Sequence, residues 1–138
     1  MTKFLFENLK HKALISDVFS RNYTGNIEKD TVKNTYYRNV IYTGKHSQLV
    51  LMALQPHEQI GNEVHKVDQF FRIEEGKVKF SLNNGKQNFM LGPGGAITVT
   101  AGTWHNVTAL DKPVKLYTVY SPKQHPAGTK EKVRPKND

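Results

Sequence analysis

The chain has 138 residues, and this length predicts one domain that can bury a core of its own. It contains no cysteine, which excludes disulfides, thiolate zinc sites and thiol nucleophiles. The net charge is +8, but five of the basic residues lie within residues 123–138 and the others are scattered. The charge therefore does not favour nucleic acid as a partner.

The sequence contains no segment with the roughly eighteen consecutive apolar residues of a membrane span. Near the start, residues 4–6 form an apolar run of only three before a charge, which is unlike a signal peptide. We therefore expect a cytoplasmic protein that does not associate with a membrane.

The first part of the chain predicts a mixture of elements. Residues 4–20 place apolar side chains at helical spacing, so we expect one or two helical turns or an arm that docks on a neighbouring subunit. Residues 27–33 indicate a short edge strand. Residues 36–42 are rich in aromatic and β-branched residues, which favour a strand. Residues 48–54 are apolar on both faces and predict a strand that is covered on both sides.

The remainder predicts short strands separated by turns. Pro56 cannot donate to a sheet ladder and ends the preceding strand. Asn84-Gly85 is typical of a tight hairpin, because both residues tolerate positive φ. Further strands are expected at 70–74, 78–82, 87–91, 96–100, 104–110 and 114–120. The polar residues 123–138 should be mostly unstructured or draped on the surface. This pattern predicts an antiparallel sandwich or barrel, with a jelly roll and a lipocalin-like barrel as alternatives.

Two stretches carry the chemistry. In the first, Glu63, His65 and Gln69 share one parity, so on a strand their side chains would point to one side. Apolar residues at 71 and 73 continue that parity, which is typical of a pocket with a polar mouth and a dry floor. The second stretch, residues 94–106, adds His105 just after a glycine-containing turn.

Both stretches resemble the two motifs of the cupin superfamily, G-x5-H-x-H-x3,4-E-x6-G and G-x5-P-x-G-x2-H-x3-N. Here they read His57-x5-Glu63-x-His65-x3-Gln69-x6-Gly76 and Gly94-x5-Thr100-x-Gly102-x2-His105-x3-Ala109, so the spacings fit throughout. The residue types depart at His57, Glu63, Gln69, Thr100 and Ala109, and Gly61 is inserted before the ligand pair. The resemblance covers roughly residues 47–121. It is closest to small bacterial single-domain cupins of the mannose-6-phosphate-isomerase-like kind.

The resemblance implies an all-β fold, a double-stranded β-helix or cupin jelly-roll barrel with a short N-terminal arm or helix. It divides the chain into an N-terminal arm with the first strands (1–46), a barrel core (47–121) and a polar C-terminal tail (122–138). It places the metal ligands at Glu63, His65, Gln69 and His105. The implied cofactor is a divalent transition metal such as Zn, Fe, Mn or Ni.

The residue types support this site independently, because imidazole nitrogen and carboxylate oxygen are good ligands for such metals. Gln69 is the weakest member, since a neutral amide oxygen binds these metals poorly, and it could instead form hydrogen bonds behind the ligands. Asp68 points outward by parity. His57 is expected in a surface loop, His11, His46 and His125 on the surface, and Trp104 in the core or a subunit interface.

Three functions remain open. The first is a metal-dependent enzyme on a small polar, sugar-like or carbonyl substrate, either an isomerase or epimerase or an oxygen-using iron enzyme. There Glu58 or Glu63 could transfer a proton if it does not bind the metal. The second is a non-catalytic cupin that binds or senses a small molecule, and the third is a basic accessory protein that works through its tail. We also expect a homodimer, because residues 48–54 and 114–120 are apolar on both faces.

Overall fold

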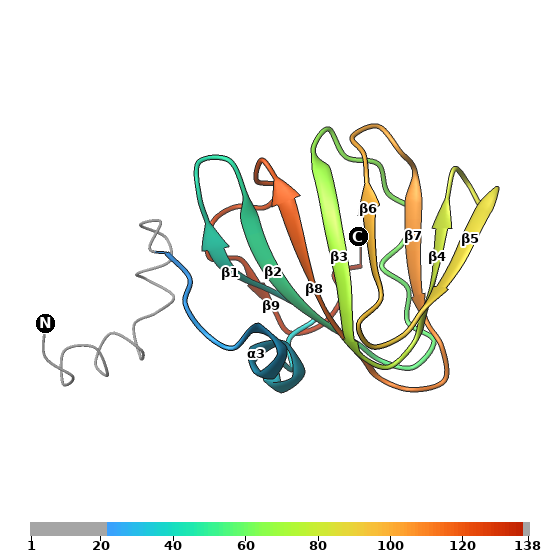
Figure 1. Cartoon of the computed structure of the whole chain (residues 1–138), viewed down its shortest axis with the longest axis horizontal. Coiled ribbons are helices and arrows are strands. Elements are labelled where there is room, and N and C mark those ends of the chain that lie inside the picture. The colour runs from blue at the N-terminus through green and yellow to red at the C-terminus, as the bar shows by residue number, and fades with distance from the viewer. Residues whose placement is uncertain (1–21, 137–138) are drawn as a thin grey trace, which may run out of the picture.

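The computed structural model describes residues 22–136. These residues form one short helix followed by antiparallel strands (Figure 1). The elements are α3 (Ile27–Lys33), β1 (Arg38–Thr43), β2 (Gln48–Leu54), β3 (Asp68–Glu75), β4 (Val78–Leu82), β5 (Gln87–Leu91), β6 (Ala96–Val99), β7 (His105–Ala109), β8 (Val114–Ser121) and β9 (Lys130–Glu131). Apart from the N-terminal region and residues 27–33, each expected strand is present, with its ends shifted by at most two residues.

The strands form two antiparallel sheets. The larger sheet has the order β6-β3-β8-β2-β1-β9, and the smaller one has the order β5-β4-β7. Isolated bridges join Gln59 to Thr108 and Glu63 to His105, so residues 59–63 run alongside β7 as an irregular extra edge. The expected all-β jelly-roll fold of a cupin is therefore confirmed, although the two sheets of the described chain do not close into a continuous barrel.

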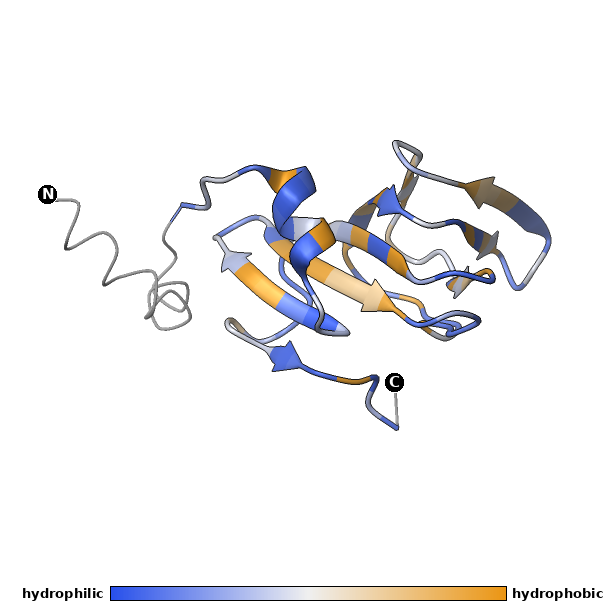
Figure 2. Cartoon of the chain, turned by 90° about the horizontal axis from the view of Figure 1, so that it is seen from below, coloured by the Kyte–Doolittle hydropathy of each residue, from blue (hydrophilic) through white to orange (hydrophobic). Residues whose placement is uncertain are grey.

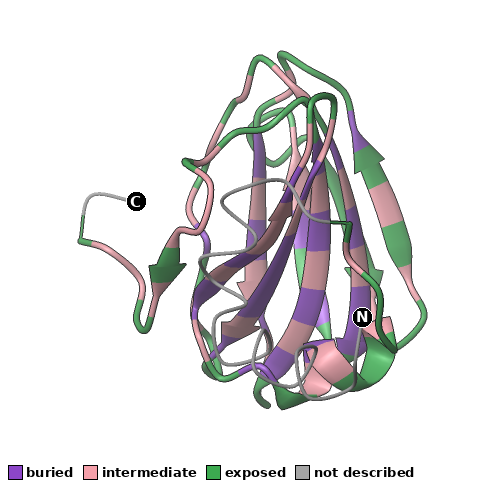
Figure 3. Cartoon of the chain, turned by 90° about the vertical axis from the view of Figure 1, so that its left-hand side faces the viewer, coloured by how far each residue is buried: buried purple, intermediate pink, exposed green. Residues whose placement is uncertain are grey.

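The core lies between the two sheets. Alternate residues of β8 are buried along its length, and the same alternation appears in β3 and β7 (Figure 3). Phe71 of the larger sheet meets Phe80 of the smaller one, with ring centroids 4.8 Å apart. Apolar residues are concentrated in the strands, whereas the C-terminal segment is mostly hydrophilic (Figure 2). Burial of alternate apolar side chains thus holds the sheets face to face.

The prediction of an edge strand at residues 27–33 is wrong, because these residues form α3. Asn26 caps the helix, since its side chain accepts a hydrogen bond from the backbone N–H of Lys29. Acidic residues in the first turn and Lys33 in the last complement the helix dipole. These end signals outweigh the β-branched residues within the segment. None of the helices in residues 22–136 is long and apolar enough to cross a membrane.

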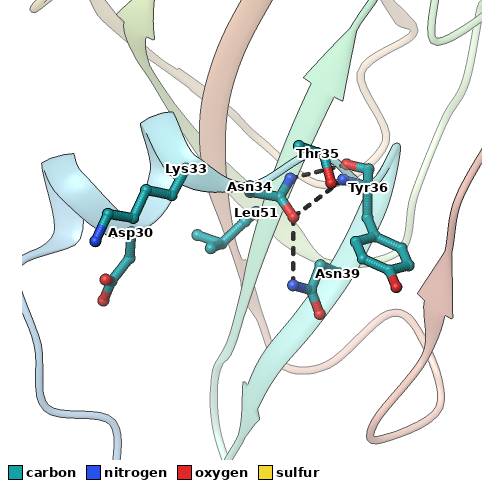
Figure 4. Close-up of a pocket in the computed structure, with 7 residues that line it drawn as sticks. All are labelled: Asp30, Lys33, Asn34, Thr35, Tyr36, Asn39 and Leu51. Carbon is teal, nitrogen blue, oxygen red and sulfur yellow. Dashed lines mark hydrogen bonds between the residues drawn. The ribbon is translucent and has the colours of Figure 1, made fainter.

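Helix α3 packs over part of the outer face of the larger sheet, in the region of β3 and β8. Its C-terminal end turns into β1 through Asn34, whose side chain bonds to both backbone groups of Tyr36 and to Asn39 (Figure 4). Leu51, an outward residue of β2, lies in this corner and is buried. The apolar outer face of 48–54 is therefore covered in part by the chain's own helix.

The C-terminal segment lies on the surface of the folded strands, which is one of the two arrangements that the sequence predicted. β9 pairs with the edge strand β1. Arg134 donates from Nε to the carbonyl oxygen of Ile60. The division of the chain at residues 46/47 and 121/122 stays a prediction. The expected helix or arm at residues 4–20 and His11 lie outside the described residues.

The expected hairpin at residues 83–85 is present, and Asn83, Asn84 and Gly85 all have positive φ. At Gly85 φ is +86°, and an added Cβ would meet nothing within 4 Å. Replacing Gly85 by valine should therefore lower the free energy of unfolding through backbone strain alone, by roughly 1–3 kcal/mol. Chemical denaturation of the two proteins measures this difference.

The matched control is Gly92→Ala, because Gly92 is not among the glycines with positive φ and its added Cβ would make only an ordinary contact with Lys77. This control should stay within about 0.5 kcal/mol of the wild type. Equal stability of Gly85→Val and the wild type would contradict the assigned turn.

Candidate metal centre

Glu63 and His105 are held opposite each other by the backbone. The N–H of each residue donates to the carbonyl oxygen of the other, at 2.8 Å in both directions. This reciprocal pair joins the loop before β3 to the first residue of β7. Two residues that lie 42 positions apart in sequence therefore present their side chains from neighbouring backbone positions.

His65 completes a compact group with these two residues. Its carbonyl oxygen accepts a hydrogen bond from Gly102 N–H, in the turn that precedes β7. One ligand atom from each of Glu63, His65 and His105 lies within 4.8 Å of the others. The rings of His65 and His105 have centroids 5.3 Å apart. Of the residue types that commonly bind metals, these three gather in one place with a geometry that can hold an ion.

Two buried nitrogen atoms of this group, Nε2 of His65 and Nε2 of His105, have no hydrogen-bond partner among residues 22–136. Nε2 of His65 does lie 3.4 Å from a carboxylate oxygen of Glu63, without forming a hydrogen bond. Because buried polar groups are normally satisfied, two such atoms beside the carboxylate of Glu63 fit a bound cation.

The ring of His105 is prepared to act as a ligand. Its Nδ1 lies 3.0 Å from the carbonyl oxygen of Thr103. A carbonyl oxygen can only accept, so Nδ1 carries the proton and Nε2 presents its lone pair. Burial lowers the pKa of His105, and the nearby His65 lowers it further, against opposing effects of the Thr103 hydrogen bond and Glu63. The imidazole is therefore neutral at physiological pH.

Gln69 lies on β3 opposite Tyr120 of β8, whose ring contacts His65, and it is 4% exposed. Its Nε2 donates to the hydroxyl of Thr118, at 2.9 Å. With the amide nitrogen facing Thr118, the amide oxygen is the end without a partner among the described residues. An amide oxygen is the only part of glutamine that can bind a cation, so the orientation of Gln69 suits a ligand or a partner of metal-bound water.

Apolar rings lie below the polar group. Phe71 packs at an angle against His105, with centroids 6.1 Å apart, and also contacts Phe80. Phe71 and Phe80 are both almost completely buried. This arrangement matches the expected combination of polar donors above a dry floor. Low local polarity strengthens any electrostatic interaction made there.

The other singled-out residues lie elsewhere. Asp68 is exposed as expected, and it accepts a hydrogen bond from Ala101 N–H. His57 and His46 are exposed, and the carboxylate of Glu58 accepts from the N–H of Gln55. Trp104 is 43% exposed, so it does not belong to the core of this chain.

His125 is not a simple surface residue, contrary to the sequence expectation. It is partly buried, and its Nε2 lies 3.3 Å from the hydroxyl of Tyr120. Tyr120 in turn packs edge-on against His65, with centroids 5.7 Å apart. Sequence reasoning missed both Tyr120 and Gln48, which holds the backbone of residue 125. The available signal was parity, because Tyr120 points to the same face of β8 as the buried Leu116 and Thr118.

Comparison with known proteins agrees with this architecture. The sequence model of the family described as "Cupin domain" matches residues 50–120. Uncharacterized protein YrkC of Bacillus subtilis (strain 168) is 43% identical over 84% of this chain and 66% of its own length. An uncharacterized protein of Acanthamoeba polyphaga mimivirus is 42% identical over 83% of this chain and 74% of its own. The chain thus spans about two-thirds to three-quarters of these relatives.

A crystal structure is also similar. The protein BH2720 of Bacillus halodurans is 39% identical, matches 83% of this chain and 91% of its own, and superposes with a TM-score of 0.80. The motif spacing, the two-sheet jelly roll and the match over residues 50–120 agree with one another. The chain therefore belongs to the cupin family.

Proposed function

We propose that the protein binds one divalent transition metal through Glu63, His65 and His105 and uses it as an enzyme on a small polar substrate. The observation that carries this proposal is the set of buried, unpartnered nitrogen atoms on the two histidines beside a carboxylate. Two imidazoles and one carboxylate leave further coordination positions open, which a substrate requires. Zn, Fe, Mn and Ni all suit these donors.

A bound metal would supply Lewis-acid chemistry, since it polarises a carbonyl or hydroxyl oxygen. The chain's own residues supply the rest. The Thr103 carbonyl orients the imidazole of His105, and Thr118 orients the amide of Gln69. The rings of Phe71 and Phe80 keep water from one side of the group. We infer a sugar-like or carbonyl substrate, with isomerisation, epimerisation or oxygen-dependent oxidation as the reaction classes.

A second candidate is a non-catalytic cupin that binds or senses a small molecule. The observation that favours it is the identity of residues 63 and 69, where Glu63 replaces the first histidine and Gln69 replaces the glutamate of the usual cupin motif. The side chain of Gln69 is neutral and already bonded to Thr118. A weaker metal site would suit reversible binding better than turnover.

We also propose that the protein forms a homodimer through the outer face of the larger sheet or the N-terminal arm. Leu49 and Val119 point outward from neighbouring strands and line a hollow of about 330 Å³ together with Tyr23 and Tyr42. Both aliphatic side chains are only half-buried, and α3 does not line this hollow. Residence in the cytoplasm stays a prediction from the sequence.

Substitution of the proposed ligands should produce a ranked loss of metal. His65→Ala and His105→Ala each remove a nitrogen donor, so purified protein should retain less than about a tenth of the wild-type metal after dialysis against a mild chelator. Glu63→Gln removes the one negative charge and should weaken binding substantially. Gln69→Ala should matter least. Elemental analysis of the dialysed proteins measures the ranking.

Gln69→Glu should bind metal more tightly than the wild type, because it adds a carboxylate while Thr118 can still donate its hydroxyl proton to it. His46→Gln is the matched control, since His46 is an exposed histidine of the β1–β2 turn. Wild-type metal content in both His65→Ala and His105→Ala would place the metal elsewhere. Absence of uptake of Fe, Mn, Ni, Zn and Cu by the wild type would remove the enzyme proposal.

Acid should destabilise the metal-free protein through His105. Burial lowers the pKa of this residue in the folded state, so the unfolded chain binds more protons once the pH falls below the ordinary imidazole value of about 6.5. The free energy of unfolding should therefore decrease as the pH is lowered from 7.5 to 5.5. Urea denaturation at several pH values measures the slope, and His105→Gln should make it shallower.

Dimerisation should be visible by light scattering at micromolar concentration, as a mass near twice 15.7 kDa. Val119→Lys should shift the protein towards the monomer, because it places a charge on the proposed contact face. Lys79→Glu, at an exposed position on the smaller sheet, changes a charge outside that face and should leave the mass unchanged. A wild-type mass of 15.7 kDa at every concentration would refute the dimer.

A further inference from the structure

A row of buried polar residues crosses the larger sheet beside the candidate metal centre. Tyr120 of β8 pairs with Gln69 of β3 on one side and with Gln48 of β2 on the other, and Gln48 pairs with Thr43 of β1. All four residues are less than 9% exposed. The same-facing residues Phe71 and Val50, two positions further along β3 and β2, belong to the apolar core, as does Leu116, four positions along β8. The row therefore links the proposed ligand Gln69 to the far edge of the sheet.

Gln48, a member of this row, holds the C-terminal segment in place by hydrogen bonds. Its side chain is completely buried and takes part in four hydrogen bonds. Its Nε2 donates to the hydroxyl of Thr43 and to the carbonyl oxygen of His125, and its Oε1 accepts from the N–H groups of Gln124 and His125. The amide of Gln48 thus bonds to both the N–H and the C=O of His125. These bonds fix the backbone position from which the imidazole of His125 extends.

The imidazole of His125 is connected to the metal centre through Tyr120. Nε2 of His125 and the hydroxyl of Tyr120 are 3.3 Å apart, and the two rings meet edge-on with centroids 5.3 Å apart. Tyr120 also packs edge-on against His65, at an interplanar angle of 81°. The ring of His65 therefore contacts the rings of both Tyr120 and His105.

We propose that Tyr120 and His125 are positioning residues of the metal centre, so that the C-terminal segment is a working part of the site. This inference rests on the proposed metal function. His125 holds the Tyr120 hydroxyl, Tyr120 fixes the plane of the His65 ring, and the fixed ring presents Nε2 beside Nε2 of His105. Outer residues that hold a metal ligand by hydrogen bonds typically change metal affinity by 10–100-fold, and here the Tyr120–His125 contact would act on His65 through the packed Tyr120 ring.

The nature of the row favours this role over simple packing. An apolar side chain at position 48 would fill the interior without needing four polar partners, and the buried polar groups would be costly if any partner were lost. The partners that Gln48 satisfies belong to the segment that carries His125. The position of the His125 imidazole therefore depends on Gln48 in the core of the fold.

Titration with Co²⁺ tests the proposal, because Co²⁺ binds to zinc-type sites and its visible absorption reports the ligand geometry. The proteins are the full-length wild type, Tyr120→Phe, His125→Ala, His125→Gln and the control His46→Gln. Tyr120→Phe and His125→Ala should bind Co²⁺ about 10-fold more weakly and show a shifted visible spectrum. His125→Gln can still hydrogen-bond to Tyr120 and should recover most of the affinity. His46→Gln should match the wild type.

The outcomes separate this inference from the proposed function. If the wild type binds no Co²⁺ and no other divalent metal, the metal function itself is wrong. If the wild type binds Co²⁺ but Tyr120→Phe and His125→Ala have its affinity and spectrum, the positioning role is wrong and the metal function stands. Tyr120→Phe keeps the buried ring, so it decides the question even if His125→Ala does not fold. Thermal melting of each metal-free variant identifies that case.

Discussion

The two backbone hydrogen bonds between Glu63 and His105 are the constraint on which the candidate site depends. They join an irregular loop to the start of β7, so the side chains of both residues leave the backbone at fixed, neighbouring positions. A backbone pair of this kind leaves little freedom in register, since a shift by one residue would turn each side chain to the other face. The carboxylate of Glu63 and the imidazole of His105 are thus neighbours because backbone pairing brings their two segments together.

Burial then gives the site its chemical character. His105 is 1% exposed and stands above the Phe71 and Phe80 rings. Such surroundings disfavour a charged imidazole and lower the pKa of His105, while the Thr103 carbonyl holds the proton on Nδ1. The same surroundings leave Nε2 without a protein partner among the described residues. A bound cation would satisfy that nitrogen without charging the ring, and the neighbouring Glu63 would offset its charge.

The larger sheet connects this site to a distant part of the chain. Tyr120 contacts the rings of both His65 and His125, and Gln48 holds His125 from within the core. The C-terminal segment also pairs with β1 through β9. A polar, basic tail would be expected to be mobile from its composition alone. Its order here comes from specific partners in the barrel.

Much of the fold followed from local chemistry in the sequence. Strand positions follow from alternation, as in Val78, Phe80 and Leu82, and the hairpin follows from the positive φ that Asn84-Gly85 tolerates. The resemblance to the cupin motifs predicted Glu63, His65, Gln69 and His105 as one ligand set, and the two histidines and Glu63 do lie together. The helix at 27–33 was missed because its end signals compete with β-branched residues in so short a segment.

Only the tertiary structure decided the contacts between distant segments. Nothing local to His125 indicates that it meets Tyr120, because the contact depends on Gln48, 77 residues away, and on the path of the tail around the barrel. The free oxygen of Gln69 likewise depends on Thr118, which strand pairing brings across from β8. The sequence determined which atoms are available to a metal, whereas packing determined which of them are buried, oriented and left without a partner.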